Sequence, residues 1–275
     1  MDLSIVIVSW NVVDKLRDNI KAIYKYTQNM SFEVFVVDNN SSDGSVEMVQ
    51  KEFSQVKLIA NVENFGFAKA NNQAIQKSLG RYVLLLNPDM RVQAKTLENM
   101  VSWMDGQIDV GVAGCHLVDE NGKTVPHVRK FPNLFDQLMI VLKVPHILPS
   151  VLNRYLMKDF DYEKPAQVDS IRGSFFMIRR NLIEKIGMLD ERYFIWFEEV
   201  DYCKQVSNTE YKVMYTPVAT CIDFVGQSFN KIGRAKKQGL FRDSMLKYFK
   251  KWHDPLECFV LYMAWSIGIL IASVF

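Results

Sequence analysis

Residues 82–86, Tyr-Val-Leu-Leu-Leu, form a wholly apolar run that is followed at once by Asn87, Pro88 and Asp89. A strand that is buried on both faces of a parallel sheet has this continuous apolar character. Ligands bind open α/β sheets just beyond the carboxyl ends of such strands, so Asp89 would point into a ligand crevice. A carboxylate there suits an oxygen-preferring cation such as Mg²⁺. Asn-Pro-Asp is equally typical of an ordinary turn, so residues at the other strand ends are needed to distinguish a turn from a ligand site.

Apolar strand patterns alternate with helical spacing in the first third of the chain. The predicted strands are 4–8, 34–37, 56–59 and 82–86, and the predicted helices between them are 11–27, 46–53 and 68–79. Short β-branched runs are typical of strands, whereas apolar residues three or four positions apart are typical of helices. Strands that alternate with helices predict an α/β fold with a doubly wound, mostly parallel sheet.

The second half of the chain is less regular. Residues 134–157 are apolar but interrupted by Pro145 and Pro149, which predicts a pair of short helices or a flap. The other predicted elements are a loop at 159–166, a strand at 168–178, a helix at 198–206, short strands at 211–215 and 218–222, and a basic helix at 234–252.

Composition excludes several classes of protein. The chain has 275 residues and a net charge of only +2, so it lacks the strong basic field that binds nucleic acid. Its four cysteines are widely spaced without a Cys-x-x-Cys pair, which argues against a zinc site or a disulfide framework. The first residues do not resemble a secretory signal, because the apolar run is short and polar residues follow it.

The C-terminal residues 256–275 carry one charged side chain, Glu257. A stretch of this length is about what a helix needs to cross a bilayer. Lys250, Lys251 and Trp252 precede it and suit the cytoplasmic membrane interface. We therefore expect a membrane-associated helix that either spans the bilayer or lies in its plane. A core helix or a contact in a homo-oligomer is the alternative, and the abrupt apolar end leaves open that the sequence is a piece of a longer protein.

Polar residues also follow the first two predicted strands. Ser9 and Asn11 follow the first strand, and Asp38 opens a run of small polar residues, including Asn40, after the second. Asp38 could accept the ring N–H of a pyrimidine base or ribose hydroxyls, although a helix-capping turn explains the same residues equally well. Neither a G-x-G-x-x-G nor a P-loop motif is present, so the usual dinucleotide and P-loop phosphate cradles are missing.

Two further segments combine small or polar residues with aromatic ones. In residues 64–72, Gly66 permits a close backbone approach, while Asn64 and Asn72 offer amide hydrogen bonds to a polar ligand. In residues 196–201, three carboxylates follow an aromatic run at the start of a predicted helix. A carboxylate near aromatic surface has a raised pKa, which suits a general base. The alternatives are an ordinary capped helix for the first segment and acids that complement the helix dipole for the second.

In their order, these segments resemble family-2 glycosyltransferases of the GT-A fold, and more closely the rhamnosyltransferase-like branch that builds bacterial surface polysaccharides. The matching segments are 4–11, 36–45, 64–72, 84–89, 172–180 and 197–203. The resemblance implies a GT-A domain over 1–254 and a membrane-associated C-terminal helix at 255–275. Within that domain it implies a Rossmann-like nucleotide-sugar half at 1–115 and an acceptor half at 116–254.

The resemblance also assigns roles to residues. Glu199 would be the catalytic base, with Asp201 as the second candidate. Asp89 would be the metal ligand of a variant Asp-x-Asp motif that has Asn87 at its first position, and Asp223 would stand where many relatives have a histidine ligand. Basic groups in 231–237 would assist the leaving group. The implied donor-binding residues are Ser9, Asn11, Asp38, Asn40, Asn64, Gly66, Phe67, Asn72, Asn87, Arg172 and Gly173.

The implied activity is an inverting, metal-dependent hexosyl transfer from a UDP- or dTDP-linked sugar, with rhamnose as one candidate. Mg²⁺ or Mn²⁺ would be the cofactor, and a polyprenyl-diphosphate-linked saccharide would be the acceptor at the cytoplasmic face of the plasma membrane. Two alternatives stay open at this point. One is a non-catalytic subunit that binds sugar nucleotides or lipid. The other is a nucleotidyltransferase, which would need a glycine-rich basic loop after its first strand, where this chain has none.

Overall fold

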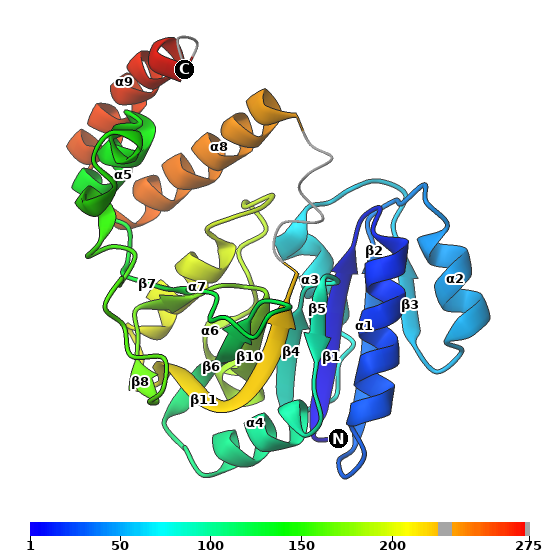
Figure 1. The fold of residues 1–275 in the computed structure, drawn as a ribbon. Helices are drawn as coiled ribbons and strands as arrows, with labels where there is room; N and C mark the ends of the chain where they lie inside the picture. Colours follow the sequence, from blue (N-terminus) through cyan, green and yellow to red (C-terminus); the bar gives the residue numbers. More distant parts are fainter. Residues whose placement is uncertain (225–232, 273–275) are drawn as a thin grey trace.

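Within residues 1–224 and 233–272, which the computed structural model describes, a nine-stranded sheet carries helices on both faces (Figure 1). The strand order is β3-β2-β1-β4-β10-β6-β11-β5, and β8 pairs with β11 outside this path. The predicted α/β fold with a mostly parallel, doubly wound sheet is confirmed.

The N-terminal half builds the parallel part of the sheet. Its strands are β1 (Leu3–Ser9), β2 (Phe32–Asp38), β3 (Lys57–Ala60) and β4 (Tyr82–Leu86), and its helices are α1 (Val13–Tyr26), α2 (Ser45–Glu52) and α3 (Phe67–Ile75). Strand β1 pairs in parallel with both β2 and β4. All five residues of β4 are buried, as its apolar sequence predicts, because core packs against both faces.

The second half adds strands of both directions. They are β5 (Met90–Val92), β6 (Val110–Val118), β8 (Ala166–Gln167), β10 (Phe175–Arg179) and β11 (Lys212–Asp223), with helices α4 (Thr96–Asp105) and α6 (Arg180–Ile186). Strand β10 lies antiparallel between β4 and β6 and joins the two halves into one sheet. A separate two-stranded sheet is made by β7 (Val128–Arg129) and β9 (Ser170–Ile171).

The remaining helices stand beside the sheet. They are α5 (Leu134–Val141), the short 3₁₀ helices η1 (Val144–His146) and η2 (Pro149–Leu152), α7 (Glu198–Val206), α8 (Arg234–Trp252) and α9 (Pro255–Ala272). Helices α5, α8 and α9 project together from the sheet (Figure 1), and a third apolar cluster joins them. We call α5, η1, η2 and α9 the helical arm. Among the described residues, no helix combines the length and apolar character that a membrane crossing requires.

Four predicted elements differ from the observed ones. The helix expected at 68–79 ends at Ile75, and the two short strands expected at 211–222 form one strand, β11. The register of β11 against β6 shifts next to Pro217, which has no N–H to donate. The strand expected at 168–178 is broken at 172–174 into β9 and β10. This last break matters most, because the three residues of the break line the cavity described next.

Candidate active site

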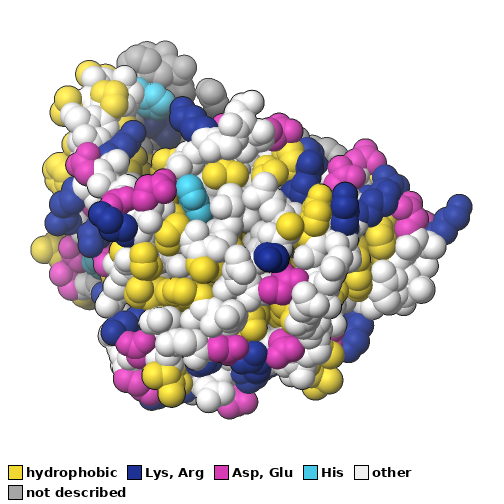
Figure 2. All heavy atoms as spheres, turned by 60° about the horizontal axis from the view of Figure 1, so that its bottom comes forward, with side chains coloured by type: hydrophobic (Ala, Val, Ile, Leu, Met, Phe, Trp, Pro, Cys, Tyr) yellow, Lys and Arg dark blue, Asp and Glu magenta, His cyan; other side chains and the backbone are white. Residues whose placement is uncertain are grey.

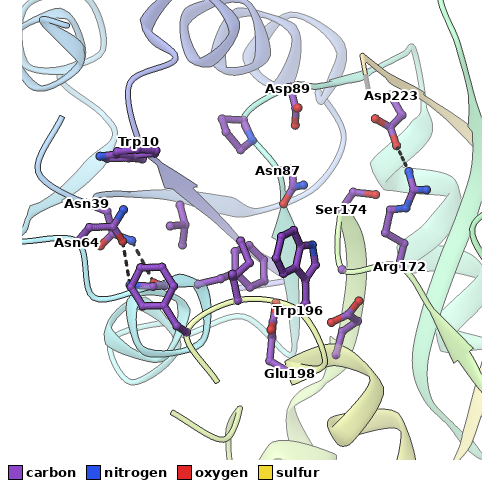
Figure 3. Close-up of a pocket in the computed structure, with 18 residues that line it drawn as sticks. Trp10, Asn39, Asn64, Asn87, Asp89, Arg172, Ser174, Trp196, Glu198 and Asp223 are labelled. Carbon is purple, nitrogen blue, oxygen red and sulfur yellow. Dashed lines mark hydrogen bonds and ion pairs between the residues drawn. The ribbon is translucent and has the colours of Figure 1, made fainter. Parts of the chain in front are cut away.

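A cavity of about 410 Å³ opens beyond the carboxyl ends of β1, β2 and β4 (Figure 3). Trp10 follows β1, Asn39 follows β2, and Asn87 and Asp89 follow β4, and all four line it. The opposite wall comes from the segment before α7 and the first turn of that helix. The volume falls within the range of about 300–1,000 Å³ that is usual for small-molecule sites.

Two aspartates meet at one side of this cavity although 134 positions separate them. Asp89 precedes β5, Asp223 ends β11, and these strands pair so that Asp223 lies opposite Met90. The backbone N–H of Phe224 donates to the carbonyl of Asp89 at 3.1 Å. Both aspartate side chains are buried yet line the cavity. The fold therefore places the two predicted metal ligands on adjacent strands.

Arg172 links this aspartate pair to the rest of the cavity. Its Nη1 lies 3.1 Å from Oδ2 of Asp223, as the dashed line in Figure 3 marks. Arg172, Gly173 and Ser174 form the break between β9 and β10, where the backbone turns into the cavity. The guanidinium thus stands where it can balance an aspartate or contact an anionic ligand.

Glu198 and Glu199 face the aspartates from the start of α7. The two residues before them, Trp196 and Phe197, have φ of 64° and 69°. The left-handed region is costly for such bulky residues, and strain of this kind concentrates at functional sites. Two successive left-handed residues turn the chain sharply, and both glutamates consequently line the cavity.

The two glutamates have different electrostatic surroundings. Burial raises the pKa of Glu198, and the charge of Glu199 raises it further. Burial also raises the pKa of Glu199, but the nearby Arg172 acts against that rise. One Oε2 atom in each side chain is buried without a hydrogen-bond partner. We infer that Glu198, the more deeply buried of the two, holds the proton while Glu199 ionises.

Gly66 allows the loop before α3 to pack against the segment before α7 at the edge of the cavity. Gly66 has φ of +82°, and a Cβ there would lie 2.3 Å from the carbonyl oxygen of Phe194. The neighbouring Phe67 N–H donates to that same carbonyl at 2.7 Å. Asn64 and Asn39 hold Gly66 from the other side, at 2.9 Å and 3.0 Å (Figure 3). The predicted close backbone approach at Gly66 is therefore observed, although its partner is protein backbone.

Asp201, the second candidate for the base, lies outside the cavity. Its side chain is fully buried and accepts hydrogen bonds from Lys251 and Trp252, both at 2.7 Å. Gln205 donates to it at 2.9 Å and Tyr193 at 3.3 Å. A carboxylate held by four donors away from the ligand space ties α7 to the end of α8. Asp201 as the second candidate base stays a prediction, and its position outside the cavity favours Glu199.

Four predicted donor-binding residues do not line the cavity, and two of them form hydrogen bonds that hold loops together. Asn72 is buried and bonds both the N–H and the carbonyl of Leu189. Asn11 accepts from the backbone N–H of Ser42 at 2.7 Å, which holds the first two strand ends together. Ser9 is fully buried within β1, and Asn40 is exposed in the left-handed region, with φ of 63°. None of the four lines the cavity.

Asp38 has an intermediate position. Its Oδ2 accepts the N–H of Ser41 at 2.8 Å, and its Oδ1 is buried without a partner. The adjacent Asn39 lines the cavity, whereas Asp38 itself does not. Recognition of a base by Asp38 therefore stays a prediction. Of the basic groups expected to assist at 231–237, Lys231 lies outside the described residues.

The cavity also contains residues that were not among the predicted site residues. They are Val8, Trp10, Asn39, Pro88, Ser174, Phe194, Ile195, Trp196 and Glu198. A signal for some of them is present in the sequence, since Trp10 directly follows the first strand and Trp196 precedes the acidic run. An aromatic residue at a strand end is equally compatible with core packing, so its position in the sequence does not distinguish a cavity residue from a core residue.

The acidic residues fit a divalent cation that is shared with a ligand. Among the described residues, no group of three or more His, Cys, Asp or Glu side chains could hold a metal ion by itself. Mg²⁺, however, is commonly bound by one or two carboxylates together with substrate phosphates. Asp89 and Asp223 supply two such carboxylates on adjacent strands of one cavity. The donor set therefore suits Mg²⁺ or Mn²⁺ when phosphate oxygens complete the coordination.

The model of the family described as glycosyl transferase family 2 matches residues 4–187, more than half of the chain. The chain therefore belongs to glycosyl transferase family 2. N-acetylglucosaminyl-diphospho-decaprenol L-rhamnosyltransferase of Mycobacterium tuberculosis is 23% identical over 198 residues, 68% of this chain and 64% of that protein. Rhamnosyltransferase WbbL of Escherichia coli is 23% identical over 242 residues, 84% of this chain and 86% of that protein. The resemblance to the rhamnosyltransferase-like branch is confirmed, and the chain spans less than two thirds of the mycobacterial relative.

A solved structure supports the fold assignment. The mannosyltransferase PcManGT from Pyrobaculum calidifontis, in complex with GDP-Man and Mn²⁺, superposes with a TM-score of 0.61 at 18% identity. The match covers 99% of this chain and 74% of that one. At this level of identity the likeness establishes the fold alone, and the predicted GT-A type fold is confirmed.

Proposed function

We propose that this protein transfers a sugar from a nucleotide diphosphate donor to a hydroxyl group of a saccharide acceptor, with inversion at the anomeric carbon. The observation that carries the proposal is the composition of one cavity. A half-buried glutamate of raised pKa, Glu199, lines it together with Arg172 and two aspartates, Asp89 and Asp223. This arrangement provides a base at one side and groups suited to a diphosphate at the other.

Glu199 is the proposed general base. It takes the proton from the acceptor hydroxyl while that oxygen forms a bond to the anomeric carbon. The bond from this carbon to the diphosphate breaks, and the nucleotide diphosphate leaves with the electron pair. Glu198 keeps its own proton, so the local negative charge stays low before the transfer. Trp196 and Phe194 restrict water at the reacting centre, since both aromatic residues line the cavity.

Arg172 supports the leaving group. Its guanidinium already lies at the cavity wall and can turn from Asp223 to the diphosphate oxygens, which it contacts through parallel N–H donors. Asp89 and Asp223 would hold a divalent cation, which when bound would neutralise charge that develops on the diphosphate. The solved PcManGT complex contains Mn²⁺, which is consistent with metal dependence in a protein of this fold.

The donor sugar is proposed from relatives. Both rhamnosyltransferases named above are 23% identical to this chain, so rhamnose on a dTDP or UDP carrier is the first donor to test. Asp38, with one buried carboxylate oxygen that lacks a partner, is the proposed group for the base or the ribose.

The acceptor is proposed to be a polyprenyl-diphosphate-linked saccharide at the cytoplasmic face of the membrane. The mycobacterial relative is named for a diphospho-decaprenol acceptor. Large apolar side chains that are at least half exposed gather on the helical arm: Phe135, Ile147, Leu148, Leu256, Phe259, Tyr262 and Met263. By contrast, basic and acidic side chains are interspersed on the face shown in Figure 2, which offers no continuous basic surface to nucleic acid.

The test is a panel of nucleotide sugars incubated with Mn²⁺ and scored for released nucleotide diphosphate, with and without lipid-linked saccharide acceptors. We expect slow release with one donor alone and faster release when a matching acceptor is added. Failure of every donor to release diphosphate under both conditions would favour a non-catalytic binding subunit.

A further inference from the structure

Arg129 carries a positive charge that the surrounding protein does not balance. The residue lies on β7, and its side chain is largely withdrawn from water. Its one hydrogen bond is from Nη1 to the carbonyl of Val128 at 2.7 Å, among the described residues. No described Asp or Glu forms an ion pair with it, and residues 225–232 and 273–275 contain no acidic side chain. A guanidinium has five donors and stays protonated in proteins, so four donors have no protein acceptor and stay accessible to solvent or a ligand, since none is fully buried.

The electrostatic surroundings of Arg129 add to this imbalance. Burial lowers the pKa of Arg129, and the positive charge of Arg172 lowers it further. Removing a charge from water costs several kcal/mol unless an opposite charge or hydrogen bonds compensate. Arg172 is paired with Asp223 and also acts on Glu199, whereas no described carboxylate pairs with Arg129. An anionic ligand would supply the compensation.

The strand register places Arg129 on the same face of the β7–β9 pair as Arg172, although Arg129 does not itself line the cavity. In the β7–β9 pair, Val128 lies opposite Ile171, and both are buried in the core. Because side chains alternate along a strand, Arg129 and Arg172 project from the other face of this pair. Arg172 lines the cavity. The hydroxyl of Tyr155 experiences the charges of both Arg129 and Glu199, so the three groups belong to one electrostatic neighbourhood.

We propose that Arg129 binds a phosphate group of the acceptor, and thereby orients the acceptor sugar towards Glu199. The inference rests on the proposed glycosyl transfer and names the acceptor as a phosphorylated, lipid-linked saccharide. Residues 130–133 alone separate β7 from α5 along the chain, so the proposed subsite adjoins the apolar arm in sequence. A lipid diphosphate bound there would have its chain at the arm and its sugar at Glu199.

A guanidinium suits this role because its planar N–H donors match phosphate oxygens in pairs. The donor diphosphate offers the same chemistry, so the two sources must be separated. Arg172 is paired with Asp223 at the donor side, whereas Arg129, besides the charge of Arg172, is acted on by Tyr155 and Tyr162, which belong to the expected acceptor half. These neighbours favour the acceptor as the source of the phosphate.

Calorimetric binding tests this assignment without requiring catalysis. Farnesyl diphosphate serves as the lipid diphosphate probe and UDP as the donor-side probe, each titrated into wild type, Arg129→Gln and Lys130→Gln. Lys130 is the matched control, since it is the next residue and is paired with Asp169 at 3.5 Å. We expect Arg129→Gln to weaken farnesyl diphosphate binding about 10- to 100-fold and to leave UDP binding unchanged. Lys130→Gln should change neither.

Each other outcome counts against the inference. If Arg129→Gln weakened the binding of both probes equally, Arg129 would be a ligand of the donor. If the variant bound farnesyl diphosphate as wild type does, or if wild type did not bind it, the proposed subsite would not exist. Thermal unfolding supplies a further readout, because loss of an unbalanced charge should leave Tm equal or higher. A marked fall in Tm for Arg129→Gln would indicate a structural role instead. These outcomes do not depend on transfer, so failure of the donor panel remains a separate result.

Discussion

Glu198 and Glu199 show how neighbouring side chains of one type acquire different roles. Glu198 is buried and Glu199 half-buried at the start of α7, and only Glu199 is acted on by the charge of Arg172. The coupled pair therefore tends to hold one proton, which the deeper Glu198 keeps. Pairs of carboxylates whose surroundings separate their pKa values commonly divide acid and base roles in this way.

Glu199→Gln should lower kcat for transfer about 10²- to 10⁴-fold, because the amide cannot accept the acceptor proton. Donor binding should change little, since Glu199 faces the acceptor side. In wild type, kcat should fall as pH decreases through a pKa above the ordinary glutamate value of about 4.3. Steady-state kinetics across pH, with donor affinity from calorimetry, measures both. Transfer by the variant at the wild-type rate would remove Glu199 from the mechanism.

Glu198→Gln should raise stability at pH 8 and have little effect at pH 4. A carboxyl whose folded pKa is raised contributes stability below its unfolded pKa, and this contribution is lost as pH rises through the folded pKa. The variant avoids this loss, and a gain of about 1 kcal/mol would raise Tm by roughly 2–4 °C. Thermal unfolding at both pH values measures the difference. The exposed Glu184→Gln is the control, and an equal pH dependence in both variants would contradict the assignment.

Helix α7 is positioned by contacts made behind the cavity. The carboxylate of Asp201 receives Lys251 and Trp252 from the end of α8. On the cavity side, Gly66 allows the loop before α3 to pack closely against the backbone of Phe194. The first turn of α7, which carries Glu198 and Glu199, is therefore held between two elements that are distant in sequence.

Asp201→Ala should destabilise the protein by about 3 kcal/mol, because Lys251, whose side chain is partly buried, and three further donors lose their acceptor. The donor dissociation constant of the folded protein should stay close to that of wild type, since Asp201 does not line the cavity. Urea unfolding and calorimetry measure the two effects. A variant of wild-type stability that had lost transfer would favour Asp201 as the base.

Gly66→Ala should lower the free energy of unfolding by about 3 kcal/mol or more. The new Cβ would lie 2.3 Å from a backbone oxygen, and alanine would have to adopt the strained positive φ of this position. Gly122→Ala is the matched control, since Gly122 has φ of +78° with no atom within 4 Å of the added Cβ. Gly122→Ala should lower the free energy of unfolding by only about 1–2 kcal/mol, the energy an L-residue needs to adopt the left-handed conformation. Denaturant unfolding compares the two, and equal losses would mean that the contact with Phe194 is readily relaxed.

The helical arm gives the molecule an apolar end beside α8. Its inner residues pack in the cluster of α5, α8 and α9, while its outer residues remain exposed. Exposed apolar surface of this kind marks an interaction site in soluble proteins. Its exposed apolar residues are the surface that the proposed lipid-linked acceptor would require.

Phe259→Ser and Leu256→Ser should each weaken binding to anionic liposomes roughly fivefold, because each removes exposed apolar area that would enter the lipid. Ile108→Ser is the control, as Ile108 is equally apolar and 85% exposed but lies outside the arm. Liposome flotation measures the bound fraction. The same loss in all three variants, or no binding by wild type, would argue that the arm does not contact lipid.

The sequence by itself determined the class of fold and most of the chemistry at the strand ends. The apolar run of β4 had to be buried on both faces, and Asp89 follows directly from its end. Helix α8 occupies the predicted residues 234–252. Local propensity and periodicity decide such features, because they depend on neighbours within a few positions.

The tertiary structure decided which groups meet. Pairing of β5 with β11 brings Asp223 beside Asp89, and contacts from α8 hold Asp201 outside the cavity. Asn72 likewise bonds to Leu189, 117 positions away, although its sequence context suggested a ligand. The unbalanced charge of Arg129 is visible only once its neighbours are known. Such long-range contacts depend on how separate elements pack, and that information is not contained in any local pattern.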